Sequence, residues 1–187
     1  VLQQAMGPRS VYRGLVSATG SAGTIASGDY LKQIFPASKI VASEALQCPT
    51  LLENGFGAHR IEGIGDKHVP WIHNVGNTDV VVAIDDNAVA NLARLFNEPM
   101  GRAYLVRMGV PEAIVGQLDL LGFSGIGNVL SACKLAKYYE MTGDDIVLTI
   151  LTDSMELYGS RLEEMRAELG DYTETQAAAD YARWLLG

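Results

Sequence analysis

The chain has 187 residues, enough for one domain with a substantial hydrophobic core or for two small ones. Its net charge of −8 argues against a nucleic-acid partner, because such surfaces need clustered lysine and arginine. No apolar run approaches the roughly 20 residues that a membrane span requires. Cys48 and Cys133 are too few for a disulfide framework, so we expect a reducing, cytoplasmic compartment. The sequence starts at Val1 rather than methionine, and from this we expect a processed or truncated chain.

The first half of the chain predicts a strand, a helix and a second strand, followed by a long loop. Pro36 ends the helix, and the loop is rich in glycine, asparagine and histidine. In chain order the expected segments are a loose arm over 1–13, a strand over 14–18, a helix over 24–35, a strand over 39–43 and an irregular segment over 48–78 with a helical turn at 50–53.

The second half predicts two further strands, each flanked by helices. In chain order we expect a strand over 79–85, a helix ending near Phe96, broken helices over 98–121, a helix over 126–139, a strand over 145–153 and amphipathic helices over 157–169 and 173–186. Strands that alternate with helices and are continuous apolar runs predict the α/β class. We expect three layers, with a mostly parallel sheet covered by helices on both faces. Residues 14–187 are expected to form a single domain.

The loop "SATGSAGTIASG" at residues 17–28 is the strongest candidate for a binding site. A strand, then glycines, then a helix start favour an anion, because the first N–H groups of a helix have no internal partner and its dipole attracts negative charge. Gly20 and Gly23 allow close approach of a ligand, and Ser21 and Thr24 can add hydroxyl donors. The alternative is a strand-to-helix turn capped by serine or threonine, with no ligand.

Three known motifs do not fit this loop. A Walker loop ends in Gly-Lys-Ser/Thr, and no lysine is present here. A dinucleotide fingerprint needs a glycine where Ala18 stands. In a hydrolase elbow around Ser21, Thr19 occupies the place of the first glycine, so an esterase stays only as a minor alternative.

A second glycine pair occurs in "GIGDKHVP", where Gly63 and Gly65 can bring the backbone close to a ligand. An ordinary surface turn is the alternative interpretation. The three histidines, His59, His68 and His73, are spaced by nine and five residues, which places no two on one helix face. We therefore expect no metal site.

The segment "TDSME" follows the strongest predicted strand. Asp153 and Glu156 have the spacing of a capping box, which is the default interpretation. Ser154, however, follows the carboxyl end of a parallel strand, where α/β proteins bind ligands.

Four motifs together resemble the cysteine synthase-like, fold type II pyridoxal-phosphate enzymes. "GSAGTIASGDYLKQIFPASKIVASE" is similar to their "GTGGTI..G...LK...P..KV..VE", and "HRIEGIGDKHVP" to "..I.GIG..F.P". "GFSGIGNVLSACKLAK" is similar to "GISSGAN..AA..LA", and "IVLTILTDSMELYGSRL" to "VVTILPDSGERYLST.L". The motifs follow the family's order and nearly its spacing, from about residue 15 to 162.

The resemblance implies a role for each matching position. The residues matching the loop that grips the phosphate of pyridoxal 5′-phosphate are Gly20, Ser21, Ala22, Gly23 and Thr24. Ser154 matches the serine that hydrogen-bonds the pyridine nitrogen. Unlike a carboxylate, a hydroxyl cannot firmly hold that nitrogen protonated, which favours β-elimination and β-replacement. The residues implied to lie beside the cofactor and substrate are Gly63, Ile64 and Gly65.

The sequence also departs from the family pattern. Ala22 replaces the family's middle glycine, so we expect it to keep an ordinary, negative φ. Met155 replaces the glycine after the serine, and 97–121 is longer than its counterpart and is expected to form an extra helical element. The family's Schiff-base lysine and substrate-carboxylate loop lie in its N-terminal half, and nothing in 1–14 matches them. We therefore expect the C-terminal part of a longer enzyme, inactive by itself.

The resemblance leads to one expected function and two alternatives. We expect part of an enzyme that uses pyridoxal phosphate for β-elimination or β-replacement on a β-substituted alanine, acting as a cytoplasmic homodimer. A threonine synthase or a serine/threonine dehydratase is the alternative within the family. A non-catalytic α/β module that binds a phosphorylated ligand or a partner is the alternative from another class.

Overall fold

The computed structural model of the chain describes residues 2–186, so Val1 of the predicted arm and Gly187 of the predicted domain lie outside the described residues. The chain divides into two compact units, which are described separately. The first contains the residues up to Asp86 together with Gly127–Ile150, and the second contains Asn87–Ile126 together with the residues from Leu151. The prediction of a single domain over 14–187 stays a prediction.

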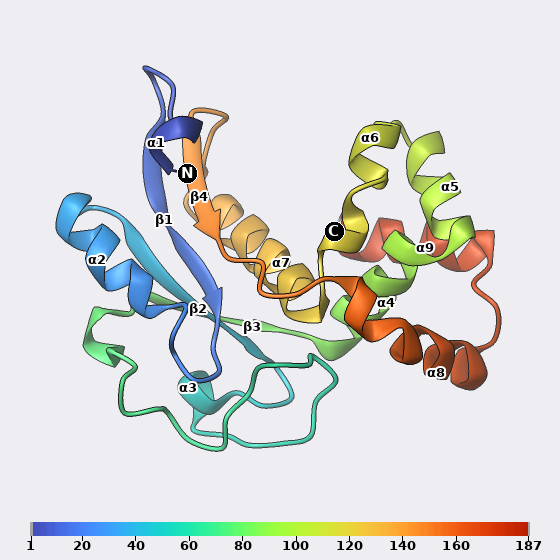
Figure 1. Cartoon of the computed structure of the whole chain (residues 1–187), viewed down its shortest axis with the longest axis horizontal. Coiled ribbons are helices and arrows are strands. Elements are labelled where there is room, and N and C mark those ends of the chain that lie inside the picture. Colours follow the sequence, from blue (N-terminus) through green and yellow to red (C-terminus); the bar gives the residue numbers. More distant parts are fainter. Residues whose placement is uncertain (1, 187) are drawn as a thin grey trace. The chain divides into compact units, whose positions relative to one another are not determined.

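The first unit is built on a four-stranded parallel sheet in the order β3-β2-β1-β4 (Figure 1). Its strands are β1 (Val11–Ala18), β2 (Lys39–Ala45), β3 (Val80–Ile84) and β4 (Asp145–Thr149). Its helices are α1 (Leu2–Ala5), α2 (Ala26–Ile34), α3 (Thr50–Glu53), α7 (Phe123–Tyr138, of which the part from Gly127 belongs to this unit) and the 3-10 turn η1 (Val75–Asn77). The parallel order confirms the predicted α/β class.

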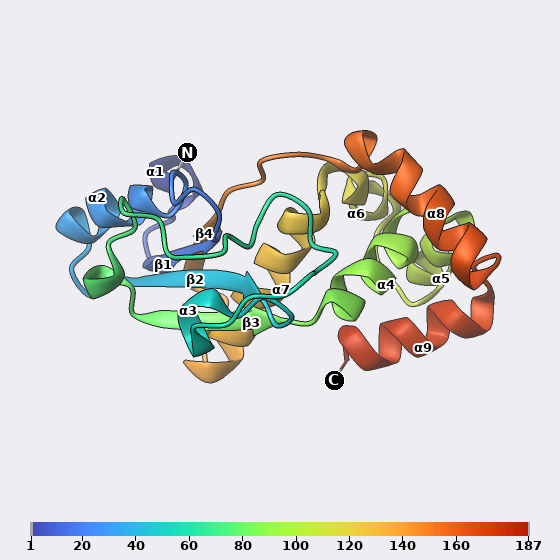
Figure 2. The ribbon, with the colours of Figure 1, turned by 90° about the horizontal axis from the view of Figure 1, so that it is seen from below.

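Helices α2 and α7 cover opposite faces of this sheet (Figure 2). On β1, Leu15 faces Gly28 of α2, whereas its neighbour Val16 packs against Leu135 of α7. Successive side chains of a strand point to opposite faces, so the continuous apolar run fills two cores rather than one. The predicted three-layer arrangement is therefore confirmed in this unit.

Strand β1 begins at Val11, inside the segment predicted to be a loose arm. The Val11 N–H donates to the Asp144 carbonyl at 2.8 Å, and the Arg13 guanidinium pairs with Asp145 at 2.6 Å. Pairing with β4, which lies more than 130 residues away in the sequence, adds these residues to the strand, and no local pattern records that pairing. Strand β4 ends at Thr149, earlier than predicted, and the Ile150 carbonyl accepts from Asn128 Nδ2 at 3.1 Å instead.

The second unit is helical. Its elements are α4 (Asp86–Asn97), α5 (Pro99–Arg107), α6 (Glu112–Val115), the 3-10 turns η2 (Leu118–Leu120) and η3 (Met155–Tyr158), α8 (Gly159–Leu169) and α9 (Glu174–Trp184). The helices α5 and α6 confirm the broken helical pattern predicted over 98–121. No helix in the described part of the chain is long and apolar enough to cross a membrane.

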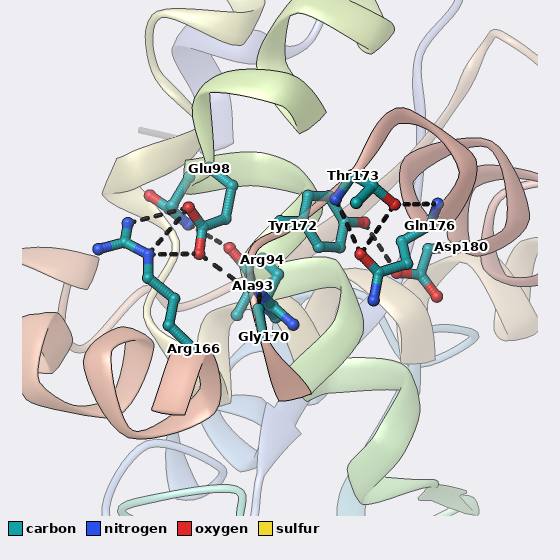
Figure 3. A network of polar contacts seen from close by, with 10 residues as sticks. Ala93, Arg94, Glu98, Arg166, Gly170, Tyr172, Thr173, Gln176 and Asp180 are labelled. Carbon is teal, nitrogen blue, oxygen red and sulfur yellow. Dashed lines mark hydrogen bonds and ion pairs between the residues drawn. The ribbon is translucent and has the colours of Figure 1, made fainter. Parts of the chain in front are cut away.

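A buried polar network holds the helices of the second unit together (Figure 3). The Arg166 guanidinium donates to both carboxylate oxygens of Glu98, at 2.9 to 3.1 Å. Arg94, only 2% exposed, donates to the Gly170 carbonyl at 2.7 Å and lies over the ring of Tyr172. These contacts join α4 and the start of α5 to α8 and to the chain that precedes α9.

Candidate phosphate-binding loop

The glycine-rich loop joins the carboxyl end of β1 to α2. In the described chain, no hydrogen-bond acceptor is found for the backbone N–H groups of the segment 20–25. The Ala26 N–H already bonds back to the Ala22 carbonyl at 3.2 Å, so helical hydrogen bonding begins inside the loop. Successive unpaired N–H groups before a helix are the arrangement that binds phosphate in α/β proteins.

Ala22 has φ of 66°, so the prediction that it keeps a negative φ is wrong. The left-handed conformation costs a residue with a Cβ roughly 1–2 kcal/mol. The Ala22 side chain is 2% exposed and packs against Ile25, Ile40 and Ala42. Burial of the methyl group offsets the backbone strain, and sequence alone gives no sign of that packing. The left-handed turn at this position is thus made with alanine.

Gly23 has no structural reason within the chain to be glycine. Its φ is not in the left-handed region, and a Cβ added there would meet only the Ser21 hydroxyl, at 3.9 Å. The structure therefore leaves room for a side chain at Gly23. A Cβ at Gly20, in contrast, would lie 3.2 Å from the Gly63 carbonyl oxygen, so Gly20 is the point where two loops touch.

The "GIG" loop is attached to the glycine-rich loop by a backbone hydrogen bond. The Gly65 N–H donates to the Thr19 carbonyl at 3.0 Å. Gly63 and Gly65 have φ of 79° and 85°, and a Cβ at Gly65 would lie 2.2 Å from His59 Nε2. These two glycines are required by backbone conformation, and at Gly65 also by a neighbour. The structure thus brings together the two predicted loops, including Ile64 between the glycines.

Thr24 has a partner that the sequence did not reveal. The Ser17 and Thr24 hydroxyl oxygens lie 2.6 Å apart, and Ser17 is 1% exposed. Ser17 Oγ also lies 3.3 Å from the Ala18 carbonyl oxygen. Ser17 belongs to the apolar strand β1, and a single serine in such a run carries no signal of a ligand site.

Glu44 is a second residue that sequence analysis missed. Its carboxylate is 1% exposed and accepts from the N–H groups of Leu51 and Leu52 at 2.8 and 2.9 Å. It therefore caps α3 from the carboxyl end of β2. A small pocket between this carboxylate and the two loops is lined by Thr19, Gly20, Glu44, Cys48, Thr50, Leu51, Gly65, Asp66, His68, Val69, Pro70 and His73. An acidic residue directly after the apolar run "KIVAS" is the sequence signal that could have identified it.

Ser154 belongs to the second unit, where it precedes η3. Its backbone is extended, and its side chain makes no capping hydrogen bond. The capping box predicted for Asp153 and Glu156 is wrong, because Asp153 accepts from the Tyr158 hydroxyl at 2.5 Å instead. A Cβ at Gly122 would lie 1.9 Å from Asp153 Oδ1, so the carboxylate is turned into the unit rather than toward the helix start.

His68 and His73 both line the small pocket beside the two loops. His59 lies against Gly65. His73 Nε2 shares a hydrogen bond with the Thr78 hydroxyl at 3.0 Å. Burial lowers the pKa of His73, and the nearby Asp29 carboxylate opposes that shift only in part. Among the described residues, no group of three histidine, cysteine, aspartate or glutamate side chains is arranged to hold a metal.

Comparison with known proteins supports the relationship that the motifs predicted. No family model matches the chain. Cysteine synthase B of Campylobacter jejuni is 31% identical over 144 residues, which cover 76% of this chain and 41% of that protein. The chain is a homologue of cysteine synthase-like, fold type II enzymes. Enzymes of that family use pyridoxal phosphate.

Solved structures agree with this relationship. O-acetylserine sulfhydrylase isoform 3 of Entamoeba histolytica matches with a TM-score of 0.66 and 26% identity, over 90% of this chain and 45% of that one. A hydrogen sulfide-producing enzyme of Fusobacterium nucleatum matches with a TM-score of 0.64 and 25% identity, over 91% of this chain and 45% of that one. The chain thus spans less than half the length of each of these relatives.

Proposed function

We propose that the loop 20–24 binds the phosphate of pyridoxal 5′-phosphate, and that the chain forms part of an enzyme for β-elimination or β-replacement on an amino acid. The observation that supports this most directly is that two features occur together at Gly23. Neither backbone conformation nor packing requires glycine there, yet the neighbouring N–H groups lack acceptors in the described chain. An anion seated on those N–H groups accounts for both facts.

The residues present fit this cofactor. Gly20, Ser21, Ala22, Gly23 and Thr24 would hold the phosphate, through backbone N–H groups and the two hydroxyls. When bound, pyridoxal phosphate withdraws electrons from the α-carbon of an amino acid. Gly63, Ile64 and Gly65 would border the cofactor and substrate, because their loop is hydrogen-bonded to Thr19 beside the phosphate loop.

We further propose that the Ser154 hydroxyl hydrogen-bonds the pyridine nitrogen. This assignment rests on the motif that follows β4 and its match to the family's "PDSGERY". A neutral hydroxyl leaves the ring a weaker electron sink than a carboxylate would, which suits elimination and replacement at the β-carbon. Ser154→Ala should slow turnover of the assembled enzyme while weakening cofactor binding only a few-fold, as expected for loss of a neutral hydrogen bond of ~0.5–1.5 kcal/mol. Unchanged turnover would exclude this role.

We propose that the lysines engaged in the first unit do not form the covalent bond to the cofactor. Lys32 and Lys39 both pair with Asp79, at 2.7 and 3.7 Å, and Lys134 donates to the Ala83 carbonyl at 3.0 Å. Borohydride reduction of the chain mixed with pyridoxal phosphate should therefore leave no stoichiometric pyridoxyl group on these lysines, as mapped by peptide mass spectrometry. A stoichiometric label on one of them would overturn the assignment.

The cellular setting is proposed on the family relationship alone. We propose a cytoplasmic enzyme that acts as a homodimer on a small amino acid. Light scattering on purified protein measures the dimer directly, and a monomer at micromolar concentration would contradict it.

The function is tested by comparing pyridoxal phosphate with pyridoxal, which lacks the phosphate. In calorimetric titrations of the full 187-residue chain, the phosphorylated form should bind more tightly. Gly23→Val should abolish that preference, because the added side chain would compete with the phosphate that we propose is bound at this loop, and it should leave the melting temperature nearly unchanged because a Cβ there meets no close neighbour. Equal binding of the two compounds by the unaltered chain would refute the proposal.

A further inference from the structure

We propose that Ser17 is a positioning residue that orients the Thr24 hydroxyl toward the bound phosphate. The inference rests on the proposed function of the loop and concerns a residue outside it. Ser17 lies on β1, is 1% exposed and faces the same side of the sheet as Leu15. Its hydroxyl oxygen lies 2.6 Å from Thr24 Oγ1, within hydrogen-bond distance.

The two hydroxyls can share their hydrogens in two ways. In the first, Thr24 donates to Ser17, and Ser17 donates to the Ala18 carbonyl at 3.3 Å. Thr24 then has no hydrogen left for a ligand. In the second, Ser17 donates to Thr24, and the Thr24 hydrogen is free to point outward.

A phosphate selects the second arrangement, because its oxygens only accept hydrogen bonds from the protein. The exchange gives up the long contact from Ser17 to the Ala18 carbonyl and gains a donor on the anion. It also forms a chain from Ser17 through Thr24 to the phosphate, in which each hydrogen bond polarises the next. No covalent bond forms or breaks, and each hydroxyl keeps its own proton.

Without Ser17 the Thr24 hydroxyl would rotate freely and lose the donor that satisfies its oxygen. Binding of the phosphate would then have to orient Thr24 unaided. The pyridine and aldehyde groups of the cofactor play no part in this contact, so the effect should depend on the phosphate.

A matched control is available on the neighbouring strand. Ser43 of β2 is also 1% exposed, and its hydroxyl lies 2.7 Å from that of Ser131 on α7. Ser43→Ala and Ser17→Ala each remove one buried hydroxyl pair from the same sheet. The Ser17 hydroxyl contacts Thr24 of the phosphate loop, whereas the Ser43 hydroxyl contacts Ser131, and only the Ser43 main-chain carbonyl, which the substitution keeps, contacts Thr19.

The test measures affinities of the full chain for pyridoxal phosphate and for pyridoxal by calorimetry. Ser17→Ala should weaken pyridoxal phosphate binding roughly three- to tenfold, the range expected for one hydrogen bond, and should leave pyridoxal binding unchanged. Ser43→Ala should change neither by more than about twofold. In a Thr24→Val background, Ser17→Ala should have no further effect, because the two residues act as one unit. If Ser17→Ala does not fold, Ser17→Cys keeps a weak donor of similar size and should give an intermediate affinity.

The outcomes distinguish failure of the role proposed for Ser17 from failure of the phosphate site proposed for the loop. Unchanged pyridoxal phosphate affinity in Ser17→Ala would overturn the role of Ser17 and leave the phosphate loop standing. Equal loss for both compounds would show a general structural effect and overturn it as well. If the unaltered chain does not prefer the phosphorylated compound, the proposed function fails, and the role of Ser17 fails with it.

Discussion

Among single residues, the positions of the glycine-rich loop and the "GIG" loop differ in whether they have room for a Cβ. Gly23 has room for one, Gly65 does not, and Ala22 carries one in a conformation that usually requires glycine. Sequence analysis found all three positions from the motif. It could not predict the left-handed φ of Ala22, because the compensation comes from Ile40 and Ala42 of β2, which are distant in sequence.

Alanine substitutions at the "GIG" loop separate backbone strain from steric clash. Gly63 and Gly65 have similar positive φ, but a Cβ at Gly63 meets nothing within 4 Å. We expect Gly63→Ala to lower the free energy of unfolding by about 1 kcal/mol, from strain alone. Gly65→Ala should lower it by at least about 1 kcal/mol more, because the His59 ring must move. Urea denaturation measures both, and equal losses would mean that His59 repacks without cost.

For helices and strands, the sequence predicted the type of each element better than the residues at which it begins and ends. The strands predicted over 14–18 and over "KIVAS" are both present, because apolar residues recur there without a helical period. The first residues of β1 were missed and β4 was predicted to extend beyond Thr149, since both boundaries depend on pairing across the sheet. The helices of the second unit were predicted, but the ion pairs and hydrogen bonds between their side chains were not.

Glu98, the buried carboxylate in Figure 3, should contribute far more to the free energy of unfolding than an exposed carboxylate does. Glu98→Gln removes the charge that Arg166 and Arg94 face, and it leaves the Arg94 cation buried. We expect a loss of about 3–5 kcal/mol in the free energy of unfolding. The matched control, Glu174→Gln, breaks the exposed pair with Arg107 and should cost at most about 1 kcal/mol. Similar melting curves for the two variants would contradict the network's role.

Asp79 gives the first unit a predictable dependence on pH. Burial raises the pKa of Asp79, but the hydrogen bonds from Lys32 and from the Ile40 N–H, with the nearby charges, outweigh burial and lower it overall. A carboxyl with a lowered folded-state pKa stabilises the fold above its unfolded pKa of about 4. That stability is lost as the pH falls through the lower folded value.

Asp79→Asn tests this dependence. The variant should be about 1–3 kcal/mol less stable than the unaltered chain at pH 7, because charge-assisted hydrogen bonds are lost. The difference should shrink as the pH falls below about 4, where the unaltered Asp79 is also becoming protonated. The exposed Asp119→Asn is the control and should leave the pH profile unchanged. Urea denaturation across pH 2–7 provides the measurement, and a constant difference would contradict the assigned pKa shift.

At the scale of the whole molecule, the family relationship explains most of what the sequence could predict. The alternation of apolar strands with helices sufficed to predict the parallel sheet, and four motifs in order sufficed to predict pyridoxal phosphate as the family's cofactor. The division into two units was not predicted, because it arises from contacts of the chain from Leu151 onward with the helices that follow β3. The Ser17–Thr24 pair and Glu44 lie within stretches that the motifs cover, but they were missed because the fold of the chain, and not the local sequence, decides which of their side chains and N–H groups meet.

The most direct test of the central claim is residue-resolved amide NMR of the full chain during addition of pyridoxal phosphate. We predict that the largest chemical-shift changes fall on the N–H groups of residues 20–24, where no acceptor is found in the described chain. Pyridoxal at the same concentration should leave those signals in place. Changes that fall elsewhere, or that are equal for the two compounds, would contradict a phosphate site in this loop.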